Sequence, residues 1–568
     1  MSVSVRTIVV AAVVAVAAMA VAAVLLLGSR TPQPTSAASA GNTDDPAGPR
    51  TAVAATLDAQ VTRVATGPGA PDPLSLVDSA PTVVLAAGDG SELPAAQLAL
   101  RLGVPLVISP TALSGGEPSD HPTAAATPAA AAIRRLGVER AVVVGGDAVA
   151  QAARDSGVAD IVEVTADDGY PARPRGIIRE AASNDGAASG LPDPGFDTQT
   201  VEQLIATAPP PAPATGAAVL VRPRDAAALP LVVAARAVGH AVVTTRATDL
   251  RADRRVVTRL AELGDRDRPP RVVLGGPRMA GIDRSRVAAH LPAIATGRQL
   301  PGGGQLVINP AQPHTRRYIG LYGVPGSTAL GALGEQPVDA SVTRAKRLAR
   351  QYRQVTDDSV TVLPCFEIIA TVASGSAGRD GNFANELPIA DLEPAVRAAR
   401  KAGLYVLLDI QPGRTDFLTL AKRYRKLLRR PHVGLALDPE WRLKPRQRHL
   451  TQIGSVGSDE VNEVTDWLAD LVERNDLPQK MLLIHQFRLS MVRNRERLDT
   501  SRDELAYVIQ MDGQGPQGTK METWRAITAT PPSDVTFGWK NFYDEDTPVR
   551  TPADTMAVAP PPVFVSYQ

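Results

Sequence analysis

The chain has almost no cysteine, no excess of charge of either sign and, over its first half, no lysine. Cys365 is the single cysteine among 568 residues, which excludes an intrachain disulfide and argues against a cysteine-ligated metal site. A lone cysteine within an apolar run is most often a small core residue. Lys and Arg number 60 against 59 Asp and Glu, so a formal net charge of +1 gives no indication of a nucleic acid as the main partner. The first lysine is Lys346, a bias that reflects composition rather than chemistry.

The length predicts several domain-sized units. We expect four segments, with boundaries at residues 1–29, 30–75, 76–305 and 312–568. The first holds an uncharged apolar run, 8–27, which is long enough to span a bilayer as a helix. Arg6 precedes it and should keep that end in the cytoplasm.

This pattern predicts an uncleaved signal anchor, and therefore a single-pass membrane protein whose bulk lies outside the cytoplasm. A signal peptide cleaved near Ala38–Ser39–Ala40 is the alternative, and would make the protein secreted or wall-associated. Residues 30–75 are rich in Ala, Pro, Thr, Gly and Ser, which is typical of a flexible linker.

The third segment, 76–305, contains two stretches with the same pattern of strand, helix, strand, helix and strand. Leu93-Pro94 and Gly103 in the first stretch recur at the same spacing as Leu229-Pro230 and Gly239 in the second. Each stretch closes on a strand followed by a glycine pair, Gly145-Gly146 in the first. Continuous apolar strands separated by helices predict a parallel sheet covered on both faces. The dinucleotide fingerprint G-x-G-x-x-G is absent from both stretches, so the glycine pairs indicate tight turns, and no cofactor is expected.

Together with Gly103-Val104-Pro105-Leu106-Val107 and Val142-Val143-Val144-Gly145-Gly146, this order resembles the cell wall-binding repeat 2 family. The resemblance covers about 80–300 in two copies and implies modules that hold surface proteins to anionic cell-wall polymers. Guanidinium groups suit such a polymer. The candidate polymer-binding residues are Arg222, Arg224, Arg251, Arg254 and Arg255, and a solvated surface is the alternative interpretation.

The last segment alternates strands and amphipathic helices with regularity. The expected strands are 318–324, 359–370, 404–411, 433–438, 481–487, 505–511, 535–543 and 563–567, and the clearest helices are 342–355, 392–402, 417–428 and 460–474. Eight strands with crossover helices over about 250 residues predict a (β/α)8 TIM barrel.

Functional groups of such barrels gather at the carboxyl ends of the strands. Asp438 and Glu440 end the fourth strand two residues apart, so we expect them to project to the same side, where mutual repulsion raises one pKa to a useful general-acid value. They are the catalytic candidates. The other strand ends supply candidate substrate-binding residues, namely Glu367, Asp409, His485, Gln510, Asp512, Trp539, Tyr543 and Asp544. Carboxylates with aromatic rings suit a sugar, and His485 as the single well-placed histidine predicts no metal site.

The run Asp438-Pro439-Glu440 resembles the end of the fourth strand in family 18 glycoside hydrolases, and family 25 lysozyme-like barrels end that strand similarly. The resemblance implies that Glu440 is the acid and that Asp438 orients it. The family 18 aspartates further upstream are replaced here by Val433 and Ala436, and the tyrosine of its strand six is missing from Gln510-Met511-Asp512. We expect a cell-envelope protein that binds a wall polymer and hydrolyses or binds a glycan through its barrel. A non-catalytic scaffolding protein with a degenerate barrel fits the same residues, and oligomeric state is left open.

Overall fold

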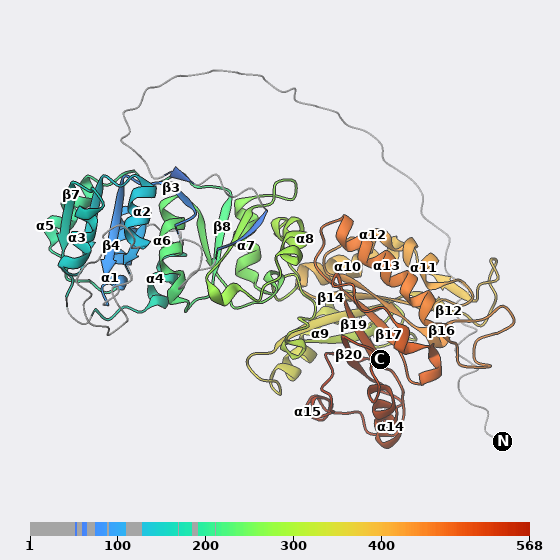
Figure 1. Ribbon diagram of the computed structural model, residues 1–568. Helices are drawn as coiled ribbons and strands as arrows, with labels where there is room; N and C mark the ends of the chain where they lie inside the picture. Colours follow the sequence, from blue (N-terminus) through green and yellow to red (C-terminus); the bar gives the residue numbers. More distant parts are fainter. Residues whose placement is uncertain are drawn as a thin grey trace, which may run out of the picture. The chain divides into compact units, whose positions relative to one another are not determined.

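The computed structural model describes residues 52–53, 60–64, 74–87, 90–109, 128–167, 170–183, 191–210 and 212–568. All described elements belong to one compact unit, Pro49–Gln568. The fold is mixed α/β, with parallel sheets in the first half and an eight-stranded parallel barrel at the C-terminus (Figure 1).

The first half holds two four-stranded parallel sheets. The first runs in the order β5 (Leu106–Ser109), β4 (Thr82–Ala87), β6 (Arg140–Val144) and β7 (Asp160–Val164). The second runs β9 (Ala241–Thr244), β8 (Ala217–Val221), β10 (Arg271–Gly275) and β2 (Val61–Val64). A short antiparallel pair, β1 (Ala52–Val53) and β3 (Val77–Ser79), is separate from both.

Helices cover these sheets, as continuous apolar strands require. They are α1 (Glu92–Leu102), α2 (Pro128–Leu136), α3 (Asp147–Asp155), α4 (Pro174–Ala181), α5 (Thr198–Ala206), α6 (Leu229–Ala237), α7 (Arg254–Leu263) and α8 (Arg284–Ala295). Helices α1, α4 and α6 pack in one apolar cluster with strands of both sheets (Figure 1). Their small residues allow this: Ala95 and Ala99 of α1 and Ala235 of α6 are fully buried there.

The fourth strand of each sheet comes from a different position in the sequence. In the first sheet β7 follows β6 through α3, whereas in the second sheet β2 precedes every other strand of that sheet in sequence. The amide of Val272 donates to the carbonyl of Gln60 at 3.0 Å, and the amide of Gly276 donates to that of Val64 at 3.1 Å. The second sheet is therefore completed by a segment far away in sequence.

This arrangement predicts the hydrogen exchange of two shortened chains. A chain that begins at Ala65 lacks β2, so the amides of β10 that face β2 should lose the protection from exchange that they keep in a chain beginning at Pro49. The amides of Val272 and Gly276 should exchange with solvent about tenfold faster or more, because each loses its acceptor. The amide of Arg271 donates to the carbonyl of Gly216, so it is the internal control. Exchange that is equal in both chains at Val272 and Gly276 would contradict the pairing.

The barrel closes through eight parallel strands. They are β11 (Arg316–Gly323), β12 (Thr361–Ala373), β14 (Tyr405–Ile410), β15 (Val433–Leu437), β17 (Lys480–His485), β19 (Leu505–Met511), β20 (Val535–Asn541) and β21 (Phe564–Tyr567), and β11 pairs with both β12 and β21. The predicted TIM barrel is thus confirmed. The helices around it are α9 (Val338–Arg353), α10 (Ile389–Ala402), α11 (Phe417–Arg423), α12 (Arg425–Leu428), α13 (Ser458–Arg474), α14 (Gln517–Thr528) and α15 (Pro552–Met556). Between β17 and β19 the chain forms only β18 (Val492–Arg493) and two 3-10 turns, η8 (Leu489–Met491) and η9 (Arg495–Arg497).

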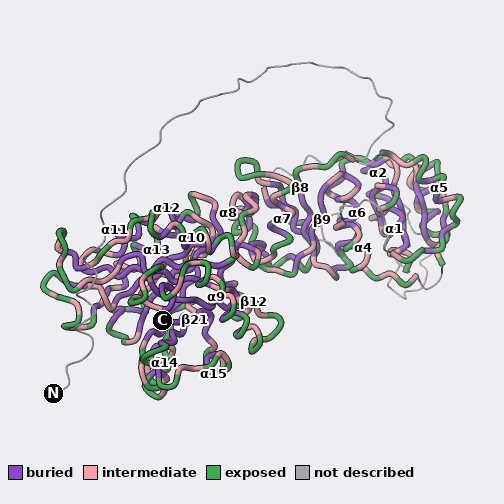
Figure 2. The backbone as a smooth tube through the Cα atoms, turned by 180° about the vertical axis from the view of Figure 1, so that it is seen from behind, coloured by how far each residue is buried: buried purple, intermediate pink, exposed green. Residues whose placement is uncertain are grey.

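The barrel interior is apolar up to its last layer of side chains. Most residues of the barrel strands are buried (Figure 2). Tyr405, Met481 and Phe564 fill it together with Cys365, which is a core residue as its apolar surroundings predict. Position 434 faces the interior and is occupied by glycine. A Cβ there would stand 2.6 Å from the carbonyl oxygen of Met481 and 2.7 Å from the hydroxyl of Tyr405, so no larger residue fits.

A short segment before β11 closes the amino-terminal end of the barrel. The side-chain oxygen of Gln479 accepts hydrogen bonds from the amides of Val307 at 2.9 Å and Ile308 at 3.1 Å. The Tyr318 hydroxyl donates to the carbonyl of Val307 at 3.0 Å. Both apolar side chains join the interior cluster. A functional site in the barrel is therefore expected at the opposite end, where the carboxyl ends of the strands lie.

The expected localisation as a single-pass membrane protein is not supported by the described helices and is corrected here. In the part of the chain that the structure describes, no helix has the length and apolar character that crossing a bilayer needs. The run 8–27, which carried that expectation, and most of the expected linker 30–75 lie outside the described residues.

Candidate active site

The alternation of side chains along the barrel strands places a polar layer above the apolar interior. Cys365, Tyr405 and Leu483 face inward, so Glu367, Asp409 and His485 follow on the same side, Glu367 in the middle of β12 and the other two near the carboxyl ends of β14 and β17. These three are fully buried, and Asp438 and Asp512 nearly so. The structure thus brings together carboxylates that the sequence predicted from separate strand ends.

His485 is the centre of this layer. Its Nδ1 lies 3.0 Å from Oδ2 of Asp512, and its Nε2 lies 3.0 Å from Oε1 of Glu367 and 3.7 Å from Oδ1 of Asp409. Burial alone lowers the pKa of His485, but the negative charges of Asp409, Glu367 and Asp438 outweigh it and raise that pKa well above its ordinary value. The ring is therefore an imidazolium held between carboxylates. Its Nε2 and both oxygens of Glu367 make no well-directed hydrogen bond, so this contact is an ion pair rather than a hydrogen bond.

Asp438 and Glu440 lie beside this cluster but are not held by one strand. The strand β15 ends at Leu437, and Pro439–Trp441 forms a 3-10 turn, η7, which begins after Asp438. The expected strand alternation between the two residues is therefore wrong. Their electrostatic coupling nevertheless holds: burial, then the charges of Glu440, Asp409 and Asp512, raises the pKa of Asp438 well above its usual range.

Glu440 is the more accessible of the pair, since it is half-buried whereas Asp438 is buried. Burial, followed by the negative charge of Asp512, raises the pKa of Glu440 to about 7, although Lys540 and His485 oppose the shift. A carboxyl with such a pKa carries a proton near neutral pH and can donate it. Asp409 behaves similarly deeper in the barrel, where burial raises its pKa to about 6 against the opposing charge of His485.

Two residues of the cluster are not among the predicted substrate-binding residues, although the sequence places one of them, Lys540, at the end of the seventh expected strand. The Tyr322 hydroxyl at the end of β11 donates to Oδ2 of Asp409 at 2.8 Å and accepts from Nε2 of Gln411 at 3.1 Å. Lys540 of β20 places its ammonium 3.4 Å from the centroid of the Tyr322 ring. The signal that could have found Tyr322 is its even spacing from Tyr318, an inward-facing residue of the same strand.

Several predicted substrate-binding residues lie elsewhere. Trp539 faces outward, because its neighbour Lys540 faces in: its ring lies 5.5 Å from that of Trp524 in α14 and is fully buried. It cannot stack on a sugar, which corrects the prediction. Gln510 does face inward, but its amide is bound to the Ser566 hydroxyl at 2.6 Å. Tyr543 and Asp544 are exposed residues that follow β20 rather than members of the buried layer.

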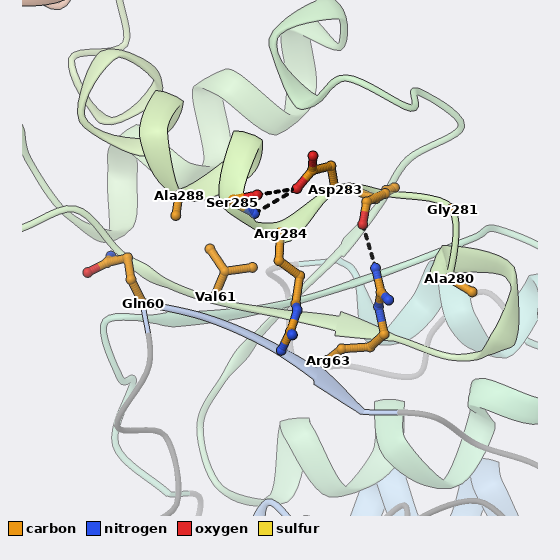
Figure 3. Close-up of a pocket in the computed structure, with 10 residues that line it drawn as sticks. Gln60, Val61, Arg63, Ala280, Gly281, Asp283, Arg284, Ser285 and Ala288 are labelled. Carbon is orange, nitrogen blue, oxygen red and sulfur yellow. Dashed lines mark hydrogen bonds between the residues drawn. The ribbon is translucent and has the colours of Figure 1, made fainter.

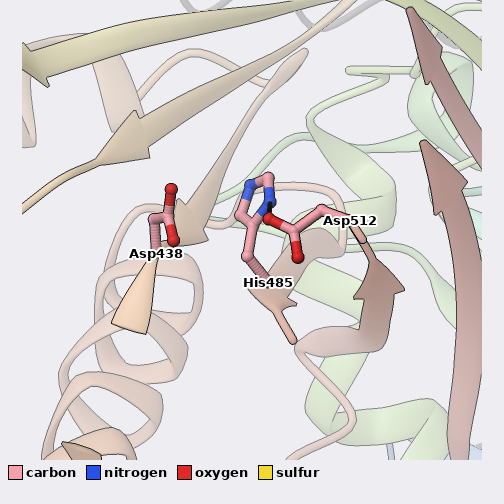
Figure 4. A group of neighbouring side chains, drawn as sticks. All are labelled: Asp438, His485 and Asp512. Atoms are coloured by element: carbon pink, nitrogen blue, oxygen red, sulfur yellow. Dashed lines mark hydrogen bonds and ion pairs between the residues drawn. The ribbon is translucent and has the colours of Figure 1, made fainter. Parts of the chain in front are cut away.

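A cation could be held by Asp438, His485 and Asp512, each of which offers a ligand atom within 4.8 Å of the others (Figure 4). Both ring nitrogens of His485 already face a carboxylate at 3.0 Å. A metal would have to displace one of these contacts and the proton on that nitrogen. The arrangement fits an imidazolium better than a metal ligand.

The five arginines proposed for polymer binding do not form one free surface. Arg251 is buried in ion pairs with Asp249 at 2.8 Å and Asp503 at 3.1 Å, so it is not available to a polymer, which corrects that prediction. Arg222 donates to the carbonyls of Thr245 and Ala247. The exposed members are Arg224, Arg254 and Arg255.

A shallow depression of about 640 Å³ lies beside β2, outside the barrel (Figure 3). Two of its polar groups already have partners. The Arg63 guanidinium donates to the carbonyl of Ile282, and Asp283 caps α8 by accepting from the amide of Ser285 at 2.9 Å. These contacts stabilise the edge of the second sheet, and Arg284 is the lining residue whose guanidinium has no partner among the described residues.

Comparison with known proteins identifies no family. No family model matches the chain, and no curated protein does, so the resemblance of 80–300 to cell wall-binding repeats has no support beyond the sequence pattern. A solved structure of oxaloacetate acetylhydrolase with the inhibitor 3,3-difluorooxalacetate is similar at 14% identity, covering 44% of this chain and 74% of that chain with a TM-score of 0.27. A likeness this distant indicates neither a reaction nor a substrate.

Proposed function

We propose that the barrel hydrolyses a glycosidic bond in a cell-wall glycan, with Glu440 as the general acid. The observation that carries this proposal is the half-buried carboxyl of Glu440 at the open end of the barrel, with a pKa of about 7, beside a floor of buried carboxylates. Glycoside hydrolysis needs a carboxylic acid that protonates the leaving oxygen and a negative charge that stabilises the oxocarbenium-like transition state.

Each group of the site has a role in this proposal. Glu440 donates its proton to the glycosidic oxygen. Asp512 supplies the negative charge, and Asp438, whose pKa burial raises well above its usual range, lies beside Glu440 as a second proton-bearing carboxyl. His485 holds Asp512 and Glu367 in place through its two ring nitrogens. Tyr322 positions Asp409 through its hydrogen bond.

The proposal is tested by incubating the full chain with purified cell walls and with their separated glycan and anionic-polymer fractions, and by measuring the reducing ends released. Release from the glycan fraction alone is the expected result. The proposal is wrong if the folded chain releases nothing from any fraction between pH 5 and 8, the range in which a carboxyl with a pKa of about 7 changes its protonation.

Replacing Lys540 by methionine should raise the pH at which kcat declines. The protonated form of Glu440 donates, so activity is present below its pKa of about 7 and is lost above it. The positive charge of Lys540 lowers that pKa, so its removal should move the decline upward by roughly half to one pH unit. Lys401→Met, which changes an exposed lysine of α10, is the control and should leave the profile unchanged. A decline that stays in place, or moves downward, would show that Glu440 is not the group that titrates.

One observation favours a second candidate, glycan binding without turnover. The floor carboxyls Glu367 and Asp409 are wholly buried, so a sugar placed at Glu440 would not contact them directly. Under this alternative the chain sediments with purified walls and releases no reducing ends. If the exposed guanidinium groups contribute to this binding, changing Arg224, Arg254 and Arg255 together to glutamine should abolish sedimentation with the walls.

A further inference from the structure

The described residues expose six large hydrophobic side chains, and four of these follow barrel strands at the open end. Leu450 is 71% exposed and Ile453 38% exposed in the segment after β15. Leu489, which follows β17, is 50% exposed, and Tyr543 follows β20. Scattered exposed apolar residues are ordinary, but a concentration at one end of a domain indicates an interaction surface.

Leu450, Ile453 and Leu489 belong to neighbouring segments. Each segment leads into one strand of a two-stranded parallel sheet, in which β16 (Val456–Gly457) pairs with β18 (Val492–Arg493). The first segment is also fastened to the site, because the amide of Gly454 donates to the carbonyl of Glu440 at 2.8 Å. The surface therefore has a fixed place beside the catalytic carboxyl.

The same two segments carry exposed cations around the apolar residues. These are Lys444, Arg446, Arg448, Arg488 and Arg493. Within the described ranges, none of the five forms an ion pair with a carboxylate; the Arg488 guanidinium lies 5.9 Å from the centroid of the Phe487 ring. We call these five cations together with Leu450, Ile453 and Leu489 the rim patch.

We propose that the rim patch docks the barrel on an anionic lipid surface. Leucine and isoleucine side chains would enter the acyl boundary, while the surrounding Lys and Arg would contact lipid phosphates, as in interfacial segments of peripheral proteins. An anionic polymer would use the cations but would gain nothing from three exposed aliphatic side chains, so the combination favours lipid. Such docking needs no membrane-spanning helix and does not depend on hydrolysis by Glu440.

The test uses the full chain, and matched variants separate the rim patch from the other parts of the chain. Sedimentation of the chain is measured with phosphatidylcholine vesicles and with vesicles that also contain phosphatidylglycerol. We expect sedimentation with the anionic vesicles, and a loss of about tenfold or more in partition for the double variant Leu450→Ser and Leu489→Ser. The matched control Ile205→Ser, which changes an aliphatic residue of α5 that is 42% exposed, should bind as the parent does.

A second variant, Lys444→Gln with Arg446→Gln, should also weaken binding, and added salt should weaken it further. Three results would overturn the proposal: no sedimentation with anionic vesicles, equal binding by the leucine variant, or an equal loss in the Ile205 control. Dextran sulfate that binds parent and leucine variant equally well, with no lipid binding, would identify a polymer surface instead. Reducing-end release assayed on the same samples reports separately on the proposed hydrolysis.

Discussion

The substitution Glu440→Gln is expected to lower kcat on the cognate glycan by about 10²–10⁴-fold, the usual contribution of a general acid. The amide has nearly the shape of the carboxyl but carries no proton that it can donate. Because Glu440 is half-buried and its backbone carbonyl still accepts from Gly454, the fold should be unaffected and KM should change little. Steady-state kinetics and a melting curve measure both.

The control is Glu545→Gln, which makes the same chemical change at an exposed residue after β20. It should keep the kcat of the parent. Equal activity of the Glu440 variant and the parent would remove Glu440 from the mechanism. A glycan-dependent loss in the Glu545 variant would move the acid to the β20 side of the barrel.

Replacing His485 by leucine is expected to lower the free energy of unfolding at pH 7 by about 3–5 kcal/mol, because it leaves buried carboxylates without their cation. Glu367 and Asp512, each 3.0 Å from a ring nitrogen, lose it directly. Denaturant titration of the parent and the variant gives the difference.

A double variant separates charge from packing in this result. If unpaired charge is the cause, adding Glu367→Leu to His485→Leu should restore about 1–3 kcal/mol. If lost packing is the cause, the second substitution should add to the loss, and the charge account would be wrong. His432→Leu is the comparison for a buried histidine whose Nε2 lies 3.2 Å from the carbonyl oxygen of Val396 and which has no carboxylate partner; it should cost less.

The barrel could be predicted from the sequence because most of its strands are largely apolar and each crossover is local. The predicted strands 404–411 and 505–511 match β14 and β19 to within a residue, and Cys365 lies in the core as its surroundings indicate. The position of Glu367, Asp409 and His485 near expected strand ends also predicted that they meet, since the carboxyl ends of parallel strands lie at one end of a barrel. The second sheet differs: β2 pairs with a strand about two hundred residues later in the chain, and no local pattern reveals such a pairing.

Two errors in the barrel site concern the direction in which side chains point near the ends of strands. Asp438 follows the last residue of β15, so the turn at Pro439, not the strand, directs Glu440. In β20 the alternation directs Lys540 inward, and Trp539 must then face α14. The burial of Arg251 could not be predicted, because one of its two ion-pair partners, Asp503, lies in a different part of the chain.

Isotope incorporation during turnover tests the central claim most directly. The full chain is incubated with purified wall glycan in H₂¹⁸O, and the released fragments are examined by mass spectrometry. Hydrolysis at the anomeric carbon predicts one ¹⁸O at each new reducing end, and none in the presence of the Glu440→Gln variant. Fragments that lack ¹⁸O, or no fragments from a folded chain, would contradict glycoside hydrolysis by this barrel.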